Sequence, residues 1–248
     1  MTLRSPLVDA AWLTDHLEDV VVADVRWYPF DDRSGRDAYE AGHIPSAFHV
    51  DVDTDLSAAP TRPGQGRHPL PTPEAFAAAM RALGIGDTDT VVAYDDTGGA
   101  MAARLVWMLR VTGHDAALLD GGLAAWEGPL ETGSVTRSRA EFTAGSWPSA
   151  HLAGFDDVGR AAEDDGPVVV DARSAARYRG EAHPLDARAG HVPGALSLPF
   201  TGNVDAATGR FLAPERLRER FAAVGVEAGT DVIAYCGSGV TACHDLLA

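Results

Sequence analysis

Cysteine is scarce in this chain: its 248 residues include two, Cys236 and Cys243. They are seven residues apart in what the sequence predicts to be one loop and helix. That spacing puts them about two helical turns from each other, which disfavours a disulfide between them. A chain without a disulfide framework suits a reducing compartment, so we expect a cytoplasmic protein.

Positive charge and long apolar runs are also in short supply. Lys and Arg number 20 against 36 Asp and Glu, which gives a formal net charge of −16. This charge opposes binding to nucleic acid or to an anionic membrane. No apolar stretch approaches membrane-spanning length, and the first residues lack the apolar segment of a signal peptide. We therefore expect no nucleic-acid partner and no membrane partner, and we expect individual arginines to bind any small anionic substrate.

Spacings typical of metal and nucleotide sites are missing as well. The cysteines and histidines do not occur in the paired arrangement of zinc ligands. The glycine pairs Gly98-Gly99 and Gly121-Gly122 lack the spacing of a dinucleotide-binding loop. The sequence therefore predicts neither a metal site nor a bound cofactor.

Internal similarity, by contrast, extends over most of the chain. Three segments recur in the same order: residues 20–26 as 168–173, residues 41–47 as 189–195, and residues 90–95 as 231–236. The offset is 147 or 148 residues for the first two pairs and 141 residues for the third. Because chance similarity rarely preserves both order and spacing, we infer two copies of one unit.

Each unit alternates short β-branched strands with helical stretches, and this alternation predicts the fold class. Residues 73–83 and 214–224 both open on Pro-Glu, which suits the first turn of a helix. Apolar strands separated by helices are typical of α/β domains, each with a mostly parallel sheet flanked by helices. We assign residues 1–133 to a first domain, the polar residues 134–152 to a linker and residues 153–248 to a second domain.

The second unit is shorter than the first. After the third recurring segment, the first unit continues through a predicted helix at 101–111 and a predicted strand at 116–119. The matching positions of the second unit extend only to the middle of that helix, at Ala248. We therefore expect the second domain to be incomplete at its C-terminus.

Cys236 is the candidate nucleophile. It ends an apolar strand and opens the loop Cys-Gly-Ser-Gly-Val-Thr, which leads into a helix. Gly237 and Gly239 allow a tight turn whose amide groups point inward, as in backbone sites that bind anions. The N-terminus of a helix lowers the pKa of a nearby cysteine. We therefore predict a reactive thiolate in the second domain, whereas the first domain has Asp95 at the matching position and is predicted to be non-catalytic.

The motifs Gly-His-Ile-Pro and Gly-His-Val-Pro place His43 and His191 at matching positions of the two units. An acid–base role would suit a histidine in one unit, but these two recur although only one unit has the cysteine. We interpret both as structural residues that bind loop backbone in buried turns.

Taken together, these motifs resemble those of the tandem rhodanese-domain sulfurtransferases, over essentially the whole chain. The resemblance rests on the paired Gly-His-Ile/Val-Pro segments, on Leu-Asp-Gly-Gly-Leu-Ala-Ala-Trp at 119–126, and on the six-residue loop 236–241. It implies two rhodanese-like domains and an enzyme whose Cys236 accepts a sulfane sulfur as a persulfide. The persulfide would pass its sulfur to a thiophilic acceptor, either cyanide or a thiol such as thioredoxin.

Within that family the uncharged loop is similar to that of 3-mercaptopyruvate sulfurtransferases, whereas thiosulfate-preferring members tend to have basic loop residues. The resemblance implies catalytic roles for Cys236, Ser238 and Asp53. It also implies a small anionic sulfur donor bound by a set of side chains and backbone amides: His68, Arg177, Arg188, Gly237, Gly239, Val240 and Thr241.

Three alternatives remain at this point. Segment 181–188 differs from the family in length and composition, so either Arg188 or no residue replaces the family's second arginine, which leaves thiosulfate open as the donor. A cysteine-dependent phosphatase is disfavoured because the loop ends in Thr241 and not in an arginine. A non-enzymatic rhodanese-like module is disfavoured because Cys236 is present.

Overall fold

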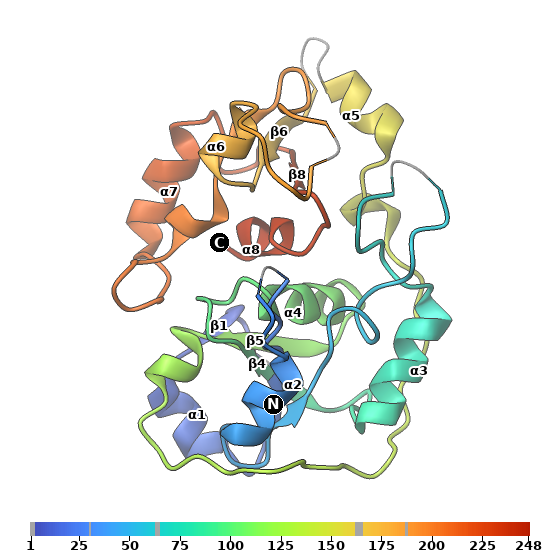
Figure 1. Cartoon of the computed structure of the whole chain (residues 1–248), viewed down its shortest axis with the longest axis vertical. Coiled ribbons are helices and arrows are strands. Elements are labelled where there is room, and N and C mark those ends of the chain that lie inside the picture. The colour runs from blue at the N-terminus through green and yellow to red at the C-terminus, as the bar shows by residue number, and fades with distance from the viewer. Residues whose placement is uncertain (1–2, 30, 63–64, 162–165, 187) are drawn as a thin grey trace.

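The computed structural model describes residues 3–29, 31–62, 65–161, 166–186 and 188–248. The chain forms two α/β domains that face each other across a pair of helices, α4 (Ala102–Val111) and α8 (Ala242–Leu247). In Figure 1 the first domain is blue to green and the second is orange to red. The predicted fold class is confirmed.

The first domain is built on a sheet of five parallel strands in the order β1-β5-β4-β2-β3. Its central strands are buried along their whole length, because helices cover both faces of a parallel sheet. The strands are β1 (Leu7–Val8), β2 (Val21–Asp24), β3 (Phe48–His49), β4 (Thr90–Tyr94) and β5 (Asp115–Leu119).

The second domain has, within its described residues, a sheet of three parallel strands in the order β7-β6-β8. The strands are β6 (Val168–Asp171), β7 (Leu196–Ser197) and β8 (Val232–Tyr235). This order repeats that of β3-β2-β4 in the first domain, and both arise from the recurring sequence segments. The predicted duplication is thus present in the topology as well as in the sequence.

The helices largely follow the predicted ranges. Helix α3 spans Pro73–Leu83, as predicted, and α7 spans Pro214–Ala222, two residues shorter than predicted. The remaining helices are α1 (Ala10–His16), α2 (Gly35–Ala41), α5 (Phe155–Ala161) and α6 (Ala175–Tyr178), with short 3-10 turns at Gly122–Ala125, Ser149–His151 and Phe200–Asn203. None of the described helices combines the length and apolar character needed to cross a bilayer.

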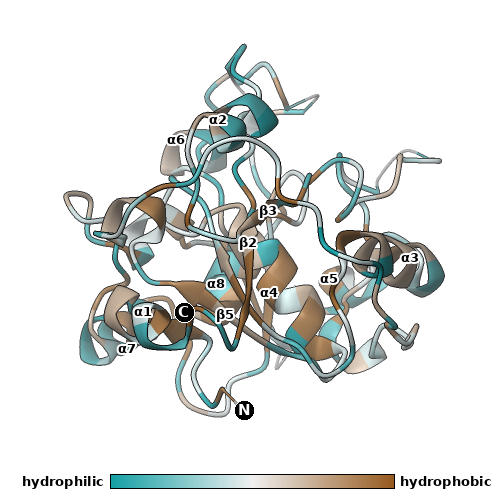
Figure 2. Ribbon diagram, turned by 90° about the horizontal axis from the view of Figure 1, so that it is seen from below, coloured by the Kyte–Doolittle hydropathy of each residue, from teal (hydrophilic) through white to brown (hydrophobic). Residues whose placement is uncertain are grey.

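Helix α4 is buried between its own sheet and α8. Its residues from Ala102 to Leu109 are all buried, which is typical of a helix that is covered on every side. Val240 and Cys243 of the second domain pack into the same apolar cluster as the core of the first domain. Figure 2 shows α4 and α8 next to each other at the centre of the molecule. The loop that carries Cys236 therefore lies at the domain interface.

The paired histidines bind loop backbone, as predicted. The Nδ1 atom of His43 lies 2.9 Å from the Tyr39 carbonyl oxygen, and Nδ1 of His191 lies 2.7 Å from the Tyr178 carbonyl oxygen. Each imidazole also stacks on the ring of that tyrosine. Burial was predicted for both and is found only for His43, because His191 lies at an exposed turn.

Candidate active site

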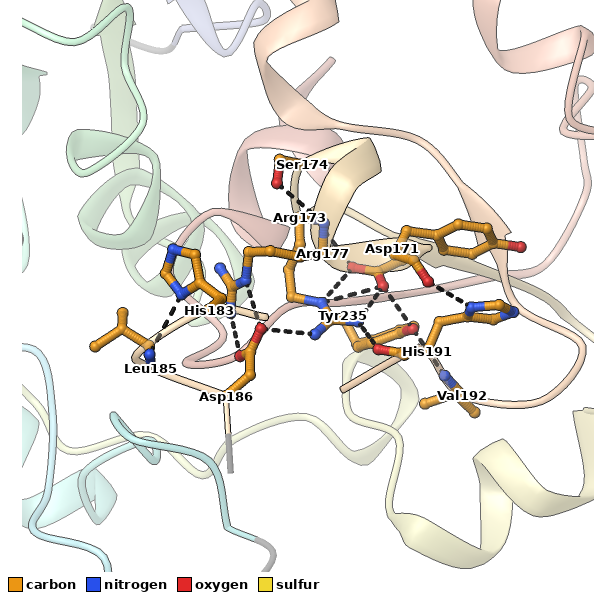
Figure 3. A network of polar contacts seen from close by, with 12 residues as sticks. Asp171, Arg173, Ser174, Arg177, His183, Leu185, Asp186, His191, Val192 and Tyr235 are labelled. Atoms are coloured by element: carbon orange, nitrogen blue, oxygen red, sulfur yellow. Dashed lines mark hydrogen bonds and ion pairs between the residues drawn. The ribbon is translucent and has the colours of Figure 1, made fainter. Parts of the chain in front are cut away.

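Cys236 follows directly on strand β8, whose last residue is anchored by a buried polar network. The Tyr235 hydroxyl donates to Asp171 Oδ2 at 2.8 Å and accepts from the Val192 amide at 3.0 Å. Asp171 in turn forms a buried ion pair with Arg173 at 2.6 Å. Figure 3 shows this network, which fixes the end of the strand and hence the position of the cysteine.

The loop after β8 directs hydrogen-bond donors at the cysteine sulfur. The Gly239 amide donates to Cys236 Sγ at 3.0 Å, and the Ser238 hydroxyl oxygen lies 3.8 Å from the same sulfur. Gly239 has a φ of 75°, a conformation that glycine adopts without strain. The chain thus turns tightly enough for its amides to surround the sulfur.

The environment of Cys236 lowers its pKa. Burial is the largest single influence and opposes ionisation, but hydrogen bonds from Thr241, from the Ser238 and Ala242 amides and from the Ser238 hydroxyl together outweigh it. For Cys243, burial raises the pKa to about 11. The two cysteines are unpaired, and only Cys236 has the environment of a reactive thiolate.

The first domain completes the site. A cavity of about 1220 Å³ is lined by Cys236 and Ser238 from the loop, by His68 and Arg104 from the first domain, and by other residues. The Arg67 amide donates to the Gly237 carbonyl oxygen at 3.2 Å. The loop that carries Cys236 is therefore in direct contact with the segment around His68.

The predicted acid, Asp53, contacts the site through His68. Asp53 Oδ1 lies 2.8 Å from His68 Nε2, and Asp53 Oδ2 accepts from Trp27 Nε1 at 2.8 Å. The indole also packs edge-on against the imidazole, with ring centroids 5.0 Å apart. The three side chains hold one another in place, and His68 is the member that faces the cavity with Ser238.

The predicted arginines differ in their surroundings. Arg177 Nε donates to Asp186 Oδ2 at 2.7 Å and its Nη2 donates to Asp186 Oδ1, so one carboxylate occupies two of its donors. This contact is the main reason that the pKa of Asp186 lies below its usual range. Arg188 lies exposed on the same segment. Figure 3 shows Arg177 and Asp186 next to Arg173.

Two further arginines at the site were not singled out from the sequence. Arg104, on α4, donates to the carbonyl oxygens of Gly239, Leu56 and His68 at 3.1, 3.2 and 3.1 Å. Arg67 lies over the loop, where a Cβ atom added to Gly237 would be 2.6 Å from Arg67 Nη1. Both belong to the first domain and are far from Cys236 in the sequence, and the one sequence feature that points to either is the adjacency of Arg67 to His68.

The matching loop of the first domain surrounds the side-chain carboxylate of Asp95. The Asp95 carboxylate is fully buried and accepts four backbone hydrogen bonds of 2.7 to 2.9 Å. The donors are the amides of Thr97, Gly99, Met101 and Ala102. In both domains the repeated loop therefore directs backbone amides at the side chain that follows the strand. In the described ranges, no group of three or more His, Cys, Asp or Glu side chains is arranged to hold a metal ion.

Comparison with known proteins matches one family model to two parts of the chain. The family model for the rhodanese-like domain matches residues 9–129 and 155–247. The chain is 43% identical over 239 residues to the probable 3-mercaptopyruvate sulfurtransferase of Pseudomonas aeruginosa, covering 93% of this chain and 82% of that protein. It is 37% identical to the human 3-mercaptopyruvate sulfurtransferase, covering 96% of this chain and 83% of that one.

A relative with a different name and a solved structure are also similar to this chain. The putative thiosulfate sulfurtransferase SseB of Mycobacterium tuberculosis is 37% identical, with 95% of this chain and 84% of that protein covered. The crystal structure of the 3-mercaptopyruvate sulfurtransferase SseA from Escherichia coli has a TM-score of 0.86 at 35% identity, and covers 98% of this chain and 92% of its own. Since one family model matches both halves and these relatives match almost the whole chain, the protein belongs to the tandem rhodanese-domain sulfurtransferases.

Proposed function

We propose that this protein is a 3-mercaptopyruvate sulfurtransferase whose Cys236 carries the transferred sulfur as a persulfide. The observation that carries the proposal is the geometry of the Cys236 loop: the Gly239 amide donates to Cys236 Sγ at 3.0 Å, the Ser238 hydroxyl lies 3.8 Å from it, and the loop has no charged side chain. These hydrogen bonds lower the pKa of Cys236. A thiolate is the form of cysteine that attacks sulfur. The names of several relatives support the choice of donor.

The first half-reaction transfers sulfur to the enzyme. The Cys236 thiolate attacks the sulfur of 3-mercaptopyruvate, a sulfur–sulfur bond forms, and the carbon–sulfur bond breaks. The electron pair of that bond remains on carbon as the enolate of pyruvate. A proton must then reach this carbon, and the proton of the transferred thiol group supplies it, which leaves pyruvate and an anionic persulfide.

Ser238 is suited to relay that proton. Its hydroxyl lies 3.8 Å from Cys236 Sγ, and it lines the same cavity as His68. The Asp53 carboxylate fixes the orientation of His68 through their 2.8 Å contact. Other enzymes activate a nucleophile with the same set of groups, namely a residue that relays a proton and an imidazole that is held in a fixed orientation.

Backbone amides stabilise the persulfide. The Asp95 loop of the first domain illustrates how four amides of the repeated loop surround an anion. The corresponding amides of the Cys236 loop, between Gly237 and Ala242, would bind the terminal sulfur in the same way. Because amide dipoles are fixed in place, they stabilise this charge without reorganisation.

The second half-reaction returns the thiolate. An acceptor nucleophile, cyanide or a thiol such as thioredoxin, attacks the terminal sulfur, and the electron pair of the sulfur–sulfur bond returns to Cys236. No cofactor is needed, since the persulfide is the intermediate. A persulfide and two unpaired cysteines suit a reducing compartment, which favours the cytoplasm.

Thiosulfate is the second candidate donor. The name of the Mycobacterium tuberculosis relative favours it. A comparison of kcat/KM for 3-mercaptopyruvate and thiosulfate, with cyanide as the acceptor and an aryl phosphate as a phosphatase control, decides between these functions. We expect the higher value for 3-mercaptopyruvate and no phosphatase activity. The Cys236→Ser variant should show background turnover only, and undiminished turnover would overturn the proposal.

Ser238→Ala belongs in the same comparison. We expect a loss of about 100-fold in kcat for 3-mercaptopyruvate, because proton delivery to carbon then lacks its relay. Thiosulfate turnover should change much less, since sulfite leaves without needing a proton on carbon. Equal losses with both donors would mean that Ser238 shapes the loop and relays no proton.

A further inference from the structure

The loops that follow strands β4 and β8 are each bound by a helix of the other domain. Gly98 in the first loop and Gly239 in the second are 141 residues apart, the offset of the third recurring pair, and both have a positive φ, of 69° and 75°. The Gly98 carbonyl oxygen lies 3.0 Å from His244 Nε2 on α8. The Gly239 carbonyl oxygen accepts from Arg104 Nη1 on α4 at 3.1 Å. Matching carbonyl groups are therefore bound reciprocally across the domain interface.

The hydrogen bonds around His244 fix which ring nitrogen carries the proton. Asn203 Oδ1 accepts from Arg220 Nε at 3.0 Å, which orients the Asn203 amide group. Its Nδ2 is therefore the donor, to Asp245 Oδ1 at 2.7 Å and to His244 Nδ1 at 3.3 Å. Because Nδ1 is an acceptor, the proton of the neutral imidazole lies on Nε2, from which it is donated to Gly98.

This network is buried where the two domains meet. His244, Asn203 and Asp245 are all buried, and the imidazole stacks on the Phe211 ring with centroids 4.5 Å apart. Burial is the main reason that the pKa of His244 lies below its usual range, although the hydrogen bond to Gly98 acts in the opposite direction. The ring is therefore uncharged at neutral pH, which is the form that the hydrogen bonds require.

Asp245 indicates that the network does more than stabilise the fold. Its Oδ2 makes no hydrogen bond within the residues that the structure describes, and burial raises the pKa of this carboxyl group to about 7. A buried carboxyl group without a full set of partners lowers the free energy of unfolding. Stability alone therefore does not account for the network, which is better explained by the geometry that it imposes on His244.

Helix α8 connects His244 to the reactive cysteine. The helix begins at Ala242, and the Ala242 amide is one of the donors that lower the pKa of Cys236. On the same helix, the Cys243 thiol donates to the Gly239 carbonyl oxygen at 3.2 Å. Because α8 is a single short helix, a change in how His244 is docked shifts these donors relative to the Cys236 sulfur.

We propose that His244 is a positioning residue: its hydrogen bond to Gly98 docks α8 on the first domain and so holds the Cys236 loop in its reactive geometry. Asn203 acts through His244 by keeping the proton on Nε2. The inference rests on the proposed function for the reaction that this geometry serves. The first domain thereby contributes to catalysis through the loop that has no nucleophile.

Alkylation of Cys236 by iodoacetamide tests the geometry of the loop without any sulfur donor, since its midpoint on the pH axis follows the pKa of the thiol. His244→Phe retains an aromatic ring and removes the donor. We expect a higher midpoint and a roughly tenfold lower kcat for both sulfur donors, with little change in KM. His244→Gln places an amide nitrogen near the position of Nε2 and should restore both the midpoint and kcat.

His114→Phe is the matched control. His114 also stacks on a phenylalanine, Phe142, with ring centroids 4.2 Å apart, and its side-chain contacts with Thr112 and Asp87 lie within the first domain. We expect a change in melting temperature at most, with the alkylation midpoint and kcat of the wild type. If His244→Phe behaves in the same way, His244 has a structural role only and the proposal is wrong.

Asn203→Ala tests the same hydrogen bond from the other side of the ring, and does so even if His244→Phe fails to fold. Without the Asn203 amide, the imidazole is free to turn or to carry its proton on Nδ1, so we expect kcat to fall roughly threefold. In the His244→Gln background the change should have little effect on kcat, because glutamine has no tautomer to fix. Equal losses of kcat in the two backgrounds would overturn the role of Asn203.

The outcomes separate this inference from the proposed function. Suppose that the wild type does not turn over 3-mercaptopyruvate but that His244→Phe raises the alkylation midpoint and His244→Gln restores it. The proposed function is then wrong and the positioning role of His244 stands. Normal turnover by the wild type, with an unchanged midpoint and kcat in His244→Phe, overturns the positioning role alone.

Discussion

Single hydroxyl groups decide the chemistry of Cys236. Burial alone would keep the thiol protonated, as it does for Cys243, seven residues further along the chain. Thr241 contributes the largest of the hydrogen bonds that reverse this effect. The two cysteines thus differ in their hydrogen-bond partners as well as in their exposure, since Cys236 is partly exposed and Cys243 is buried.

Thr241→Val should raise the pKa of Cys236, because it keeps the volume of the side chain and removes its hydroxyl. The rate of alkylation by iodoacetamide rises with the thiolate fraction, so its midpoint on the pH axis reports this pKa. We expect the wild-type midpoint below that of an ordinary cysteine and the Thr241→Val midpoint above that of the wild type. Thr241→Ser retains the hydroxyl and should keep the wild-type midpoint; a raised midpoint in both variants would contradict the argument.

Among single residues, local sequence patterns pointed to those that are close to Cys236 in the chain, and the family resemblance added Asp53 and His68. Cys236, Ser238 and the loop glycines lie in one short motif, and their spacing is enough to predict a tight anion-binding turn. Arg67 and Arg104 reach the loop from 169 and 132 residues away, counted to Cys236. Such contacts depend on how the two domains pack, which no local pattern specifies.

At the scale of elements, one loop structure serves two purposes. In the second domain it surrounds a reactive sulfur, and in the first it surrounds the Asp95 carboxylate. The Asp95 carboxylate satisfies amides that would otherwise be buried without an acceptor. At the position that matches Cys236, the first domain therefore has a side chain that stabilises the same backbone.

Asp95→Asn should destabilise the first domain. The side-chain NH₂ group of asparagine is a donor, so at least one of the four buried backbone amides would lose its acceptor. We expect the free energy of unfolding to fall by roughly 3 kcal/mol.

Urea denaturation followed by tryptophan fluorescence measures this change. Asp96→Asn, at the exposed neighbouring position, is the control and should have little effect. Equal stability of the two variants would mean that the Asp95 hydrogen bonds contribute nothing net.

Helix ends marked by capping residues in the sequence were predicted more accurately than ends that lack such residues. Helix α3 has Thr72 as its N-cap, proline at its first turn and Gly84 at its C-terminus, and its predicted range is confirmed. Helix α7 lacks a side-chain N-cap hydrogen bond, and its predicted C-terminal end was two residues too long. The parallel sheets followed from apolar strands that alternate with helices.

At the scale of the whole molecule, Arg104 connects the two domains. This buried guanidinium bridges Gly239 of the second domain to Leu56 and His68 of the first. It has no carboxylate partner within the described ranges, and its Nε makes no hydrogen bond there. Burial of a cation without a carboxylate partner lowers the free energy of unfolding, so we infer that Arg104 positions the Cys236 loop more than it stabilises the fold.

Arg104→Met should therefore impair catalysis more than folding. The methionine fills similar space but leaves the Gly239 carbonyl oxygen with only the weak Cys243 thiol as a donor, so we expect kcat to fall about tenfold for both sulfur donors. Arg110→Met, on the same helix, removes a hydrogen bond to Ala116 within the first domain and should leave kcat nearly unchanged. Steady-state kinetics and calorimetric melting check both variants. A selective rise in KM for one donor would instead indicate that Arg104 binds that donor.

The shared core around α4 has a consequence for how this duplicated chain can evolve. A domain without the nucleophile is ordinarily under weaker selection for catalysis than the domain that carries it. Here Val240 and Cys243, which support the reactive loop, pack into the core of the first domain. Substitutions in the core of the first domain, far from any substrate, would therefore reduce turnover. The sequences of the two domains are thus expected to change in a correlated way.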